Sequence, residues 1–151
     1  MCDIADEEII KTDDGYIYNP YNPVNIEITL NDVQSILRSY GLPTTVVDAR
    51  FAKPIDKELI KILAKNHEIL VTVEEGSIGG FSAQVMSFLS MEGLLDNGLK
   101  FRPIFFPDKF INHGKPDEQI VECGVDQDNI VTTVLNALGI TASAKLSLER
   151  A

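Results

Sequence analysis

The chain has 151 residues, 44% of them hydrophobic, and a mean hydropathy of +0.03, values that fit a single globular domain with its own core. Its formal net charge of -10 and its pI near 4.5 exclude a nucleic-acid-binding protein, because such proteins neutralise phosphates with clustered lysine and arginine. No apolar run approaches the roughly 20 residues that cross a bilayer, and the acidic amino terminus lacks the regions of a signal peptide, so we expect a cytoplasmic protein without membrane contact.

The amino-terminal segment is acidic and then rich in turn-forming residues. Asp13-Asp14-Gly15 is followed by Asn19-Pro20-Tyr21-Asn22-Pro23, a composition that favours loops. We therefore expect residues 1–24 to be a poorly ordered head, outside a folded domain at residues 25–139.

The first predicted unit of this domain is a strand followed by a helix. Residues 25–30 alternate weakly between polar and apolar side chains, which predicts a strand. The helix after it is opened by Asn31 and closed by Gly41, with apolar positions at Val33, Ile36, Leu37 and Tyr40.

Two further strand and helix units follow. Residues 44–48 are a β-branched run that suits a buried parallel strand. Residues 69–73 give the clearest strand pattern of the chain. The helix between these strands can start at Pro54, and its apolar stripe is Ile55, Leu59, Ile62 and Leu63. The second helix follows Gly80, and its apolar stripe is Phe81, Val85, Phe88 and Leu89.

The carboxyl-terminal part continues this alternation. Residues 101–106 predict a strand that Pro103 marks as an edge or an irregular position. Residues 117–123 can form a short helix, and Asp126 can cap a longer one that stops at Gly139, before a tail at residues 140–151. The order predicts an α/β fold with three layers, in which helices cover both faces of a mostly parallel sheet of about five strands.

The cysteine and histidine residues do not form a recognisable site. Cys2 and Cys123 lie far apart, as do His67 and His113, and none has a second ligand at a metal-like spacing. We assign no disulfide and no metal ligand to the chain.

Adjacent carboxylates end the clearest strand. Glu74 and Glu75 lie where open α/β sheets place ligands, and such a pair could bind a cation or have perturbed pKa values. Successive strand residues point to opposite faces, so we expect the two side chains to diverge unless the strand has already ended before them. A structural or interfacial role is the favoured interpretation.

A glycine-rich turn follows the carboxylates and precedes a helix. Free amides after Gly76, Gly79 and Gly80 could hold an anion, but the spacing differs from the dinucleotide fingerprint and lacks the lysine of a P-loop. A tight turn is the favoured interpretation. Ser77 lacks the surroundings of a hydrolase nucleophile.

Two other loops carry charged residues after predicted strands. Arg50 and Lys53 could form an anion site, although ion pairs with Asp48 and Asp56 are the simpler expectation. His113 lies in a loop with Asp108 and Lys109, and a histidine near a carboxylate could act as an acid or base. No nucleophile or second catalytic group stands at a spacing that indicates catalysis. The pattern gives no catalytic triad.

Four of these segments together resemble the carboxyl-terminal domain of 1-deoxy-D-xylulose-5-phosphate synthase, a transketolase relative. They are DARFAKPID at residues 48–56, VTVEEGSIGGF at 71–81, PDKFINHG at 107–114 and GVD at 124–126. The resemblance implies the transketolase carboxyl-terminal fold. It also implies a parent enzyme that uses thiamine diphosphate and magnesium to condense pyruvate with glyceraldehyde 3-phosphate for isoprenoid precursors.

The same resemblance places the cofactor and the chemistry on two larger upstream domains. We therefore assign this chain no catalytic, cofactor-binding or metal residue, and expect a role in packing and in a homodimer or a contact with the thiamine-binding domains. The alternative is a free-standing assembly module that meets a partner subunit or a small anion. The amino end fits the family only roughly, so its first strand is expected to be replaced or displaced, leaving a sheet edge open to another chain.

Overall fold

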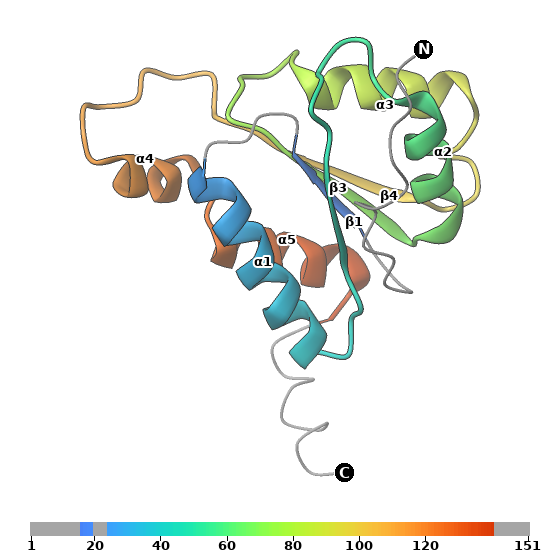
Figure 1. Cartoon of the computed structure of the whole chain (residues 1–151), viewed down its shortest axis with the longest axis horizontal. Coiled ribbons are helices and arrows are strands. Elements are labelled where there is room, and N and C mark those ends of the chain that lie inside the picture. Colours follow the sequence, from blue (N-terminus) through green and yellow to red (C-terminus); the bar gives the residue numbers. More distant parts are fainter. Residues whose placement is uncertain (1–15, 20–23, 141–151) are drawn as a thin grey trace.

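The computed structural model describes residues 16–19 and 24–140. It forms three layers, with a parallel sheet between two pairs of helices (Figure 1). Within the described residues there are four strands and five helices, namely β1 (Tyr16–Asn19), α1 (Val24–Ser39), β2 (Thr45–Asp48), α2 (Lys57–Asn66), β3 (Ile69–Val73), α3 (Phe81–Met91), β4 (Lys100–Ile104), α4 (Pro116–Cys123) and α5 (Gln127–Leu138). The α/β class and the layered arrangement are confirmed, with four described strands where about five were expected.

The strands lie in the order β2-β1-β3-β4, and every neighbouring pair is parallel. Strand β3 is buried along its whole length, as a continuous apolar run in a parallel sheet should be. Strand β4 is an edge strand with Pro103 opposite Thr72, so the edge position predicted from that proline is confirmed.

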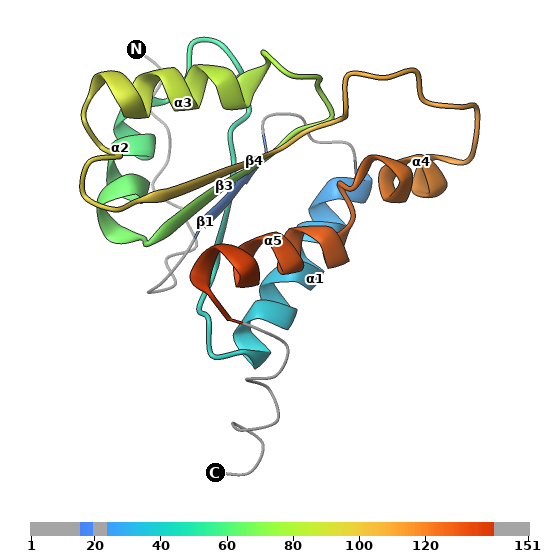
Figure 2. The ribbon, with the colours of Figure 1, turned by 180° about the vertical axis from the view of Figure 1, so that it is seen from behind.

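Two apolar clusters hold the layers together on opposite faces of the sheet. Figure 2 shows helices α1 and α5 on one side of the sheet and α2 and α3 on the other. Alternate residues of β3 contribute to each, as the two-residue period of a strand requires. Helices α1 and α5 pack on the side of Val71 and Val73, whereas α2 and α3 pack on the side of Leu70. Phe81, Val85, Phe88 and Leu89 are all buried, which confirms the predicted stripe of α3.

The predicted strand at residues 25–30 is wrong, because α1 begins at Val24, seven residues before the predicted cap at Asn31. Leu30, Val33 and Leu37 are buried against the sheet at helical spacing. The weak alternation before them continues this helix, since tertiary burial of the stripe outweighs a local strand preference. The stop at Gly41 is confirmed by its positive φ of 72° after the helix end.

The expected loop character of the head is also wrong at Tyr16–Asn19, which forms β1 between β2 and β3. Tyr-Ile-Tyr is a good strand sequence, but it is so short that the surrounding turn residues mask it. The remaining head positions, and the tail from residue 141, lie outside the described residues. The edges of the described sheet are β2 and β4, and an edge open to another chain stays a prediction.

Helix α2 begins later than predicted. Asp56 is its cap and accepts a hydrogen bond from the Leu59 amide at 2.9 Å, so Pro54 and Ile55 precede the helix. Ile60, Leu63 and Ala64 form its buried side, while Ile62 is 52% exposed. The caps of the last helix are as predicted, with Asp126 at its start and Gly139 at its end.

Candidate functional site

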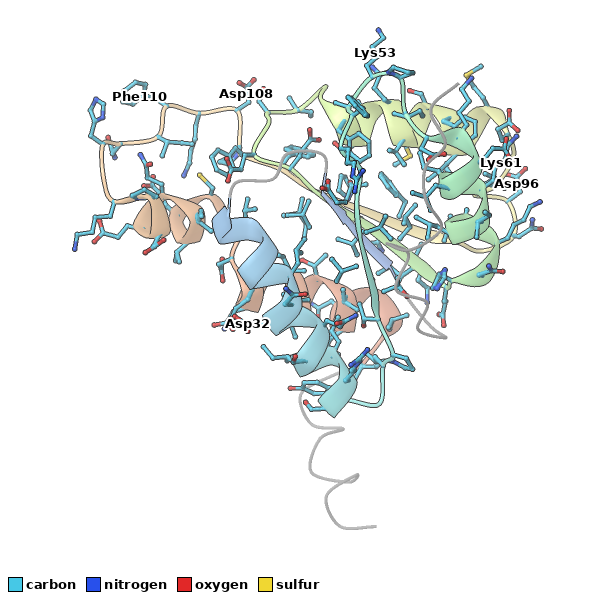
Figure 3. All side chains as sticks on the ribbon, viewed as in Figure 1. Asp32, Lys53, Lys61, Asp96, Asp108 and Phe110 are labelled. Atoms are coloured by element: carbon cyan, nitrogen blue, oxygen red, sulfur yellow. The ribbon has the colours of Figure 1, made fainter. Side chains whose placement is uncertain are left out.

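The loops that follow β2, β3 and β4 leave the sheet at one edge, because the strands are parallel. They are residues 49–56, 74–80 and 105–115, and they contain every residue singled out from the sequence: Arg50, Lys53, Glu74, Glu75, Gly76, Ser77, Gly79, Gly80 and His113. The topology therefore gathers the predicted positions at the carboxyl edge. It does not make one cluster of them, since the loops of Lys53 and Phe110 lie well apart (Figure 3).

The centre of the edge is the buried carboxylate of Glu74, which is 3% exposed. Its Oε2 accepts a hydrogen bond from the Phe81 amide at 2.8 Å. Its Oε1 accepts from the Ser82 amide at 2.9 Å and from the Ser82 hydroxyl at 2.6 Å. Glu74 thus satisfies amides in the first turn of α3, where a negative charge also complements the helix dipole.

Two glycines make room for this carboxylate. A β-carbon on Gly76 would lie 3.0 Å from Glu74 Oε2, and one on Gly80 would lie closer still. Gly80 is the cap residue of α3 and provides no side-chain hydrogen bond. The glycines and Glu74 therefore act as one unit, in which a distant carboxylate performs the capping that a local serine or aspartate usually performs.

Glu75 behaves differently from its neighbour. Glu75 is exposed, whereas Glu74 is buried. Strand β3 ends at Val73, before both residues, so the condition that the strand continues through them is not met, and their divergence by strand alternation stays a prediction. Part burial of its carboxyl still raises the pKa of Glu75 above the ordinary value of 4.5. With one carboxylate buried on the α3 side and the other exposed, the pair does not present two oxygens to a common cation.

The turn after β3 is fixed to the neighbouring strand and to itself. The Glu74 amide donates to the Ile104 carbonyl at 2.9 Å, and the Phe106 amide donates to the Gly76 carbonyl at 2.9 Å. The Gly80 amide donates to the Ser77 carbonyl at 3.2 Å. Ser77 and Ile78 are exposed at the tip of the turn, and the Ile78 residue is 66% exposed. A turn held by backbone hydrogen bonds therefore presents the apolar side chain of Ile78 at the protein surface.

The loop after β2 is shaped by its own carboxylates. Asp48 accepts a hydrogen bond from the Arg50 amide at 2.9 Å, and Arg50 adopts a positive φ of 53°. Asp56 is occupied as the cap of α2. Both carboxylates proposed as ion-pair partners therefore accept backbone amides, and the Lys53 side chain points outward (Figure 3).

The loop after β4 reaches away from the sheet and carries Phe110, which is 83% exposed (Figure 3). Lys109 Nζ lies 3.6 Å from Glu122 Oε1, and Gln119 Nε2 donates to the Asn112 carbonyl at 2.9 Å. These contacts tie the loop to α4. His113 is exposed within it.

Two buried hydroxyl groups near the edge were not singled out from the sequence. Ser82 completes the Glu74 site, and its only sequence signal is its place directly after Gly80-Phe81 at a helix start. Thr72 is 1% exposed, and its Oγ1 has no hydrogen-bond partner in the described part of the chain. Thr72 and Glu74 lie two residues apart, so both side chains point to the α3 face of the sheet.

The donor set does not fit a metal-bound diphosphate. Across residues 16–19 and 24–140, no three histidine, cysteine, aspartate or glutamate side chains gather as metal ligands. The buried carboxylate of Glu74 already accepts hydrogen bonds from three donors of its own chain.

Among residues 16–19 and 24–140, no helix is long and apolar enough to cross a membrane.

This fold, with a capped glycine turn at the carboxyl edge, is that of a transketolase-type domain. Residues 29–130 match the family model described as transketolase, C-terminal domain, and the chain belongs to that family.

Among named relatives, the chain is 54% identical over 110 residues to a probable chloroplastic 1-deoxy-D-xylulose-5-phosphate synthase of Capsicum annuum. It is 52% identical over 110 residues to a chloroplastic 1-deoxy-D-xylulose-5-phosphate synthase 1 of Cannabis sativa, and 51% identical over 105 residues to that of Oryza sativa subsp. japonica. These matches cover 73%, 73% and 70% of the chain but about 15% of each relative, so the chain spans a small part of the length of the curated relatives it matches.

A solved structure gives the same fold. It is a split gene transketolase, described as an inactive beta4 tetramer, which is similar with a TM-score of 0.70 and 26% sequence identity. The match covers 85% of this chain and 40% of that one. The resemblance drawn from the four sequence segments is confirmed by these comparisons.

Proposed function

We propose that the chain serves as the non-catalytic carboxyl-terminal domain of a 1-deoxy-D-xylulose-5-phosphate synthase, a thiamine-diphosphate-dependent transferase. The observation that carries this proposal is the identity of more than half over 105 to 110 residues to three such synthases, confined to about 15% of their length. A similarity of that kind assigns the chain to one domain of the enzyme.

The chemistry of the parent enzyme would belong to thiamine diphosphate and magnesium bound by other domains. The described residues support this division, because Glu74 is committed to the start of α3 and Glu75 points elsewhere. What the chain's own residues do is hold the carboxyl-edge turn rigid through Glu74, Ser82 and the backbone contacts to β4.

The role left to the domain is assembly. Large apolar side chains are exposed on each of the three edge loops, at Phe51, Ile78 and Phe110, which are 68%, 66% and 83% exposed. Exposed apolar groups of this size on structured loops are common at protein contacts. Together with a structural relative described as a tetramer, they support a homodimer or a contact with the thiamine-binding domains of the parent enzyme.

The proposal is tested by calorimetric titration of the purified chain with thiamine diphosphate and Mg²⁺, beside a coupled assay with pyruvate and glyceraldehyde 3-phosphate. We expect neither binding nor turnover from the chain alone. The assay is then repeated after adding the thiamine-binding domains of a related synthase as a separate polypeptide, and activity should appear only in the mixture. Turnover by the chain alone would contradict the proposal.

The alternative of a free-standing assembly module is distinguished by the same mixture. Such a module would give no activity with the added domains and would not co-elute with them in size-exclusion chromatography. Light scattering on the chain alone then reports whether it forms a dimer, which both proposals allow.

The cellular location remains a proposal. The cytoplasmic location is proposed here for the chain, whereas the relatives named above are described as chloroplastic. Fractionation of the source cells, with detection by an antibody to the chain, separates the two compartments.

A further inference from the structure

We infer that the amino-terminal turn of α3 is a carboxylate-binding site that the chain fills with its own Glu74. A helix start alone would not justify this, but here a buried carboxylate is held in place by three donors. The inference extends beyond assembly and does not depend on it. It also identifies the anion of the glycine-rich turn, which is a side chain of the same molecule.

The site is built for one carboxylate. Two of its donors are backbone amides, of Phe81 and Ser82, whose positions are set by the helix, and the third is the Ser82 hydroxyl. The donors divide between the two oxygens of the carboxylate, with two on Oε1 and one on Oε2. Donors arranged in this way match a group that offers two oxygens.

The walls of the site are as specific as its donors. Added β-carbons on Gly76 and Gly80 would meet Oε2 within 3.0 Å or less, so the space between them is filled by that oxygen. The first turn of α3 contains no acidic residue of its own. Glu74 thus supplies the negative charge at this helix start. Removing its carboxylate leaves the three donors without an acceptor and leaves the space between Gly76 and Gly80 empty.

Two consequences follow for the chain. While Glu74 is in place, an external anion finds the two amides and the hydroxyl already occupied, so the intact turn does not bind phosphate there. When Glu74 is shortened, the vacated space has the size of its lost carboxyl and methylene groups. Acetate fits that space, whereas propionate is one carbon too long and the tetrahedral phosphate ion brings further oxygens that the glycine walls exclude.

The test is chemical rescue of Glu74→Ala by sodium acetate, sodium propionate or sodium phosphate, compared with sodium chloride at equal ionic strength and pH 7. The melting temperature of the full chain is followed by circular dichroism, and wild type and Glu75→Ala serve as controls. Acetate should raise the melting temperature of Glu74→Ala saturably, on the order of 5 °C, as a ligand specific for the folded state does. The longer propionate should raise it less, phosphate should not raise it, and neither control protein should respond.

A second variant keeps the inference testable if Glu74→Ala is too unstable to melt cooperatively. Gly80→Asp places a carboxylate at the cap position itself, where aspartate is a preferred residue. It should destabilise wild type, because its β-carbon and charge meet Glu74, yet stabilise Glu74→Ala, whose site is empty. The folded fraction recovered on refolding replaces the melting temperature as the readout for any variant that does not melt.

Either gain, from acetate or from Gly80→Asp in the Glu74→Ala background, supports the carboxylate site. The inference is overturned if neither restores Glu74→Ala beyond the response of Glu75→Ala. Equal rescue by phosphate and acetate would overturn the assigned ligand class, since it would show that the glycine walls do not select for two oxygens.

Discussion

Glu74 and Gly80 compete for one small volume, because a β-carbon on Gly80 would come closer to Glu74 Oε2 than real β-carbons approach any atom. The clash with the carboxylate therefore explains why a side chain at position 80 is unfavourable.

Gly80→Ala should consequently destabilise the chain by about 1–3 kcal/mol, the usual cost of overpacking a buried site. The expected fall in melting temperature is several degrees, measured by thermal unfolding. Gly114→Ala is the matched control, since its β-carbon would meet its neighbours at 3.5 Å or more and the change should stay within about 0.5 kcal/mol. Equal losses in both variants would refute the competition with Glu74.

Ser82→Ala should destabilise the chain by about 1.5–3 kcal/mol, the range for a hydrogen bond to a charged group. The hydroxyl of Ser82 donates to a buried carboxylate at 2.6 Å, so its loss leaves Oε1 of Glu74 with one donor fewer. The measurement is the free energy of unfolding in urea.

Ser87→Ala is the control for that measurement because it changes the same residue type in the same helix. The Ser87 hydroxyl is exposed and donates only to the Ala83 carbonyl at 2.8 Å, a carbonyl of its own helix. We expect an effect within about 0.5 kcal/mol. If Ser87→Ala lowers the free energy of unfolding as much as Ser82→Ala does, the hydrogen bond from Ser82 to the Glu74 carboxylate is no stronger than an ordinary exposed one.

The sequence predicted the elements whose apolar pattern is unambiguous. Strand β3 and helix α3 were expected from a continuous apolar run and a clear stripe, and both are found as expected. These segments are long or fully buried, so local preference and tertiary packing favour the same structure.

The amino-terminal unit could not be predicted in the same way. Tyr16–Asn19 has four residues between turn formers, and its strand is defined by pairing on both sides with β2 and β3. Residues 25–30 alternate locally but belong to α1, since Leu30, Val33 and Leu37 fix the helix through contacts with residues far away in sequence. Pairing and burial of this kind are properties of the whole fold.

The sequence predicted where the glycine-rich turn lies, but not that the Glu74 carboxylate caps α3. The glycine turn was expected at the end of a strand, and it follows the end of β3 at Val73. That the Glu74 carboxylate reaches forward to cap α3 depends on where the helix starts in space, which no local spacing gives. Ser82 was missed for the same reason.

Thr72→Val should stabilise the chain by about 1 kcal/mol. The Thr72 hydroxyl is buried without a hydrogen-bond partner in the described part of the chain, and an unsatisfied buried polar group carries a desolvation cost of about 1–3 kcal/mol that valine of similar shape avoids. Unfolding in urea measures the change.

Thr44→Val is the matched control, in which the same substitution should lower the free energy of unfolding. Thr44 is also buried, but its hydroxyl donates to the Leu42 carbonyl at 3.0 Å. This substitution should cost about 0.5–1.5 kcal/mol, the net value of one hydrogen bond. Loss of stability in Thr72→Val would show that its hydroxyl is satisfied after all.

Glu75→Gln should stabilise the chain slightly at neutral pH, and the gain should disappear on acidification. Part burial raises the pKa of Glu75 in the folded state above the ordinary value of 4.5, so the folded state holds this proton more tightly than the unfolded state does. By linkage, the stability that wild type has below pH 4.5 falls as the pH rises through the raised pKa. Glutamine carries no such proton, so the difference in stability between the two proteins appears as the pH rises through the raised pKa and stays constant above it, at about 1 °C in melting temperature.

Melting curves from pH 3 to pH 8 measure this difference, with Glu58→Gln at a highly exposed position as the control. A gain that is already present at pH 3, or that appears equally in Glu58→Gln, would show that burial of Glu75 is not its cause.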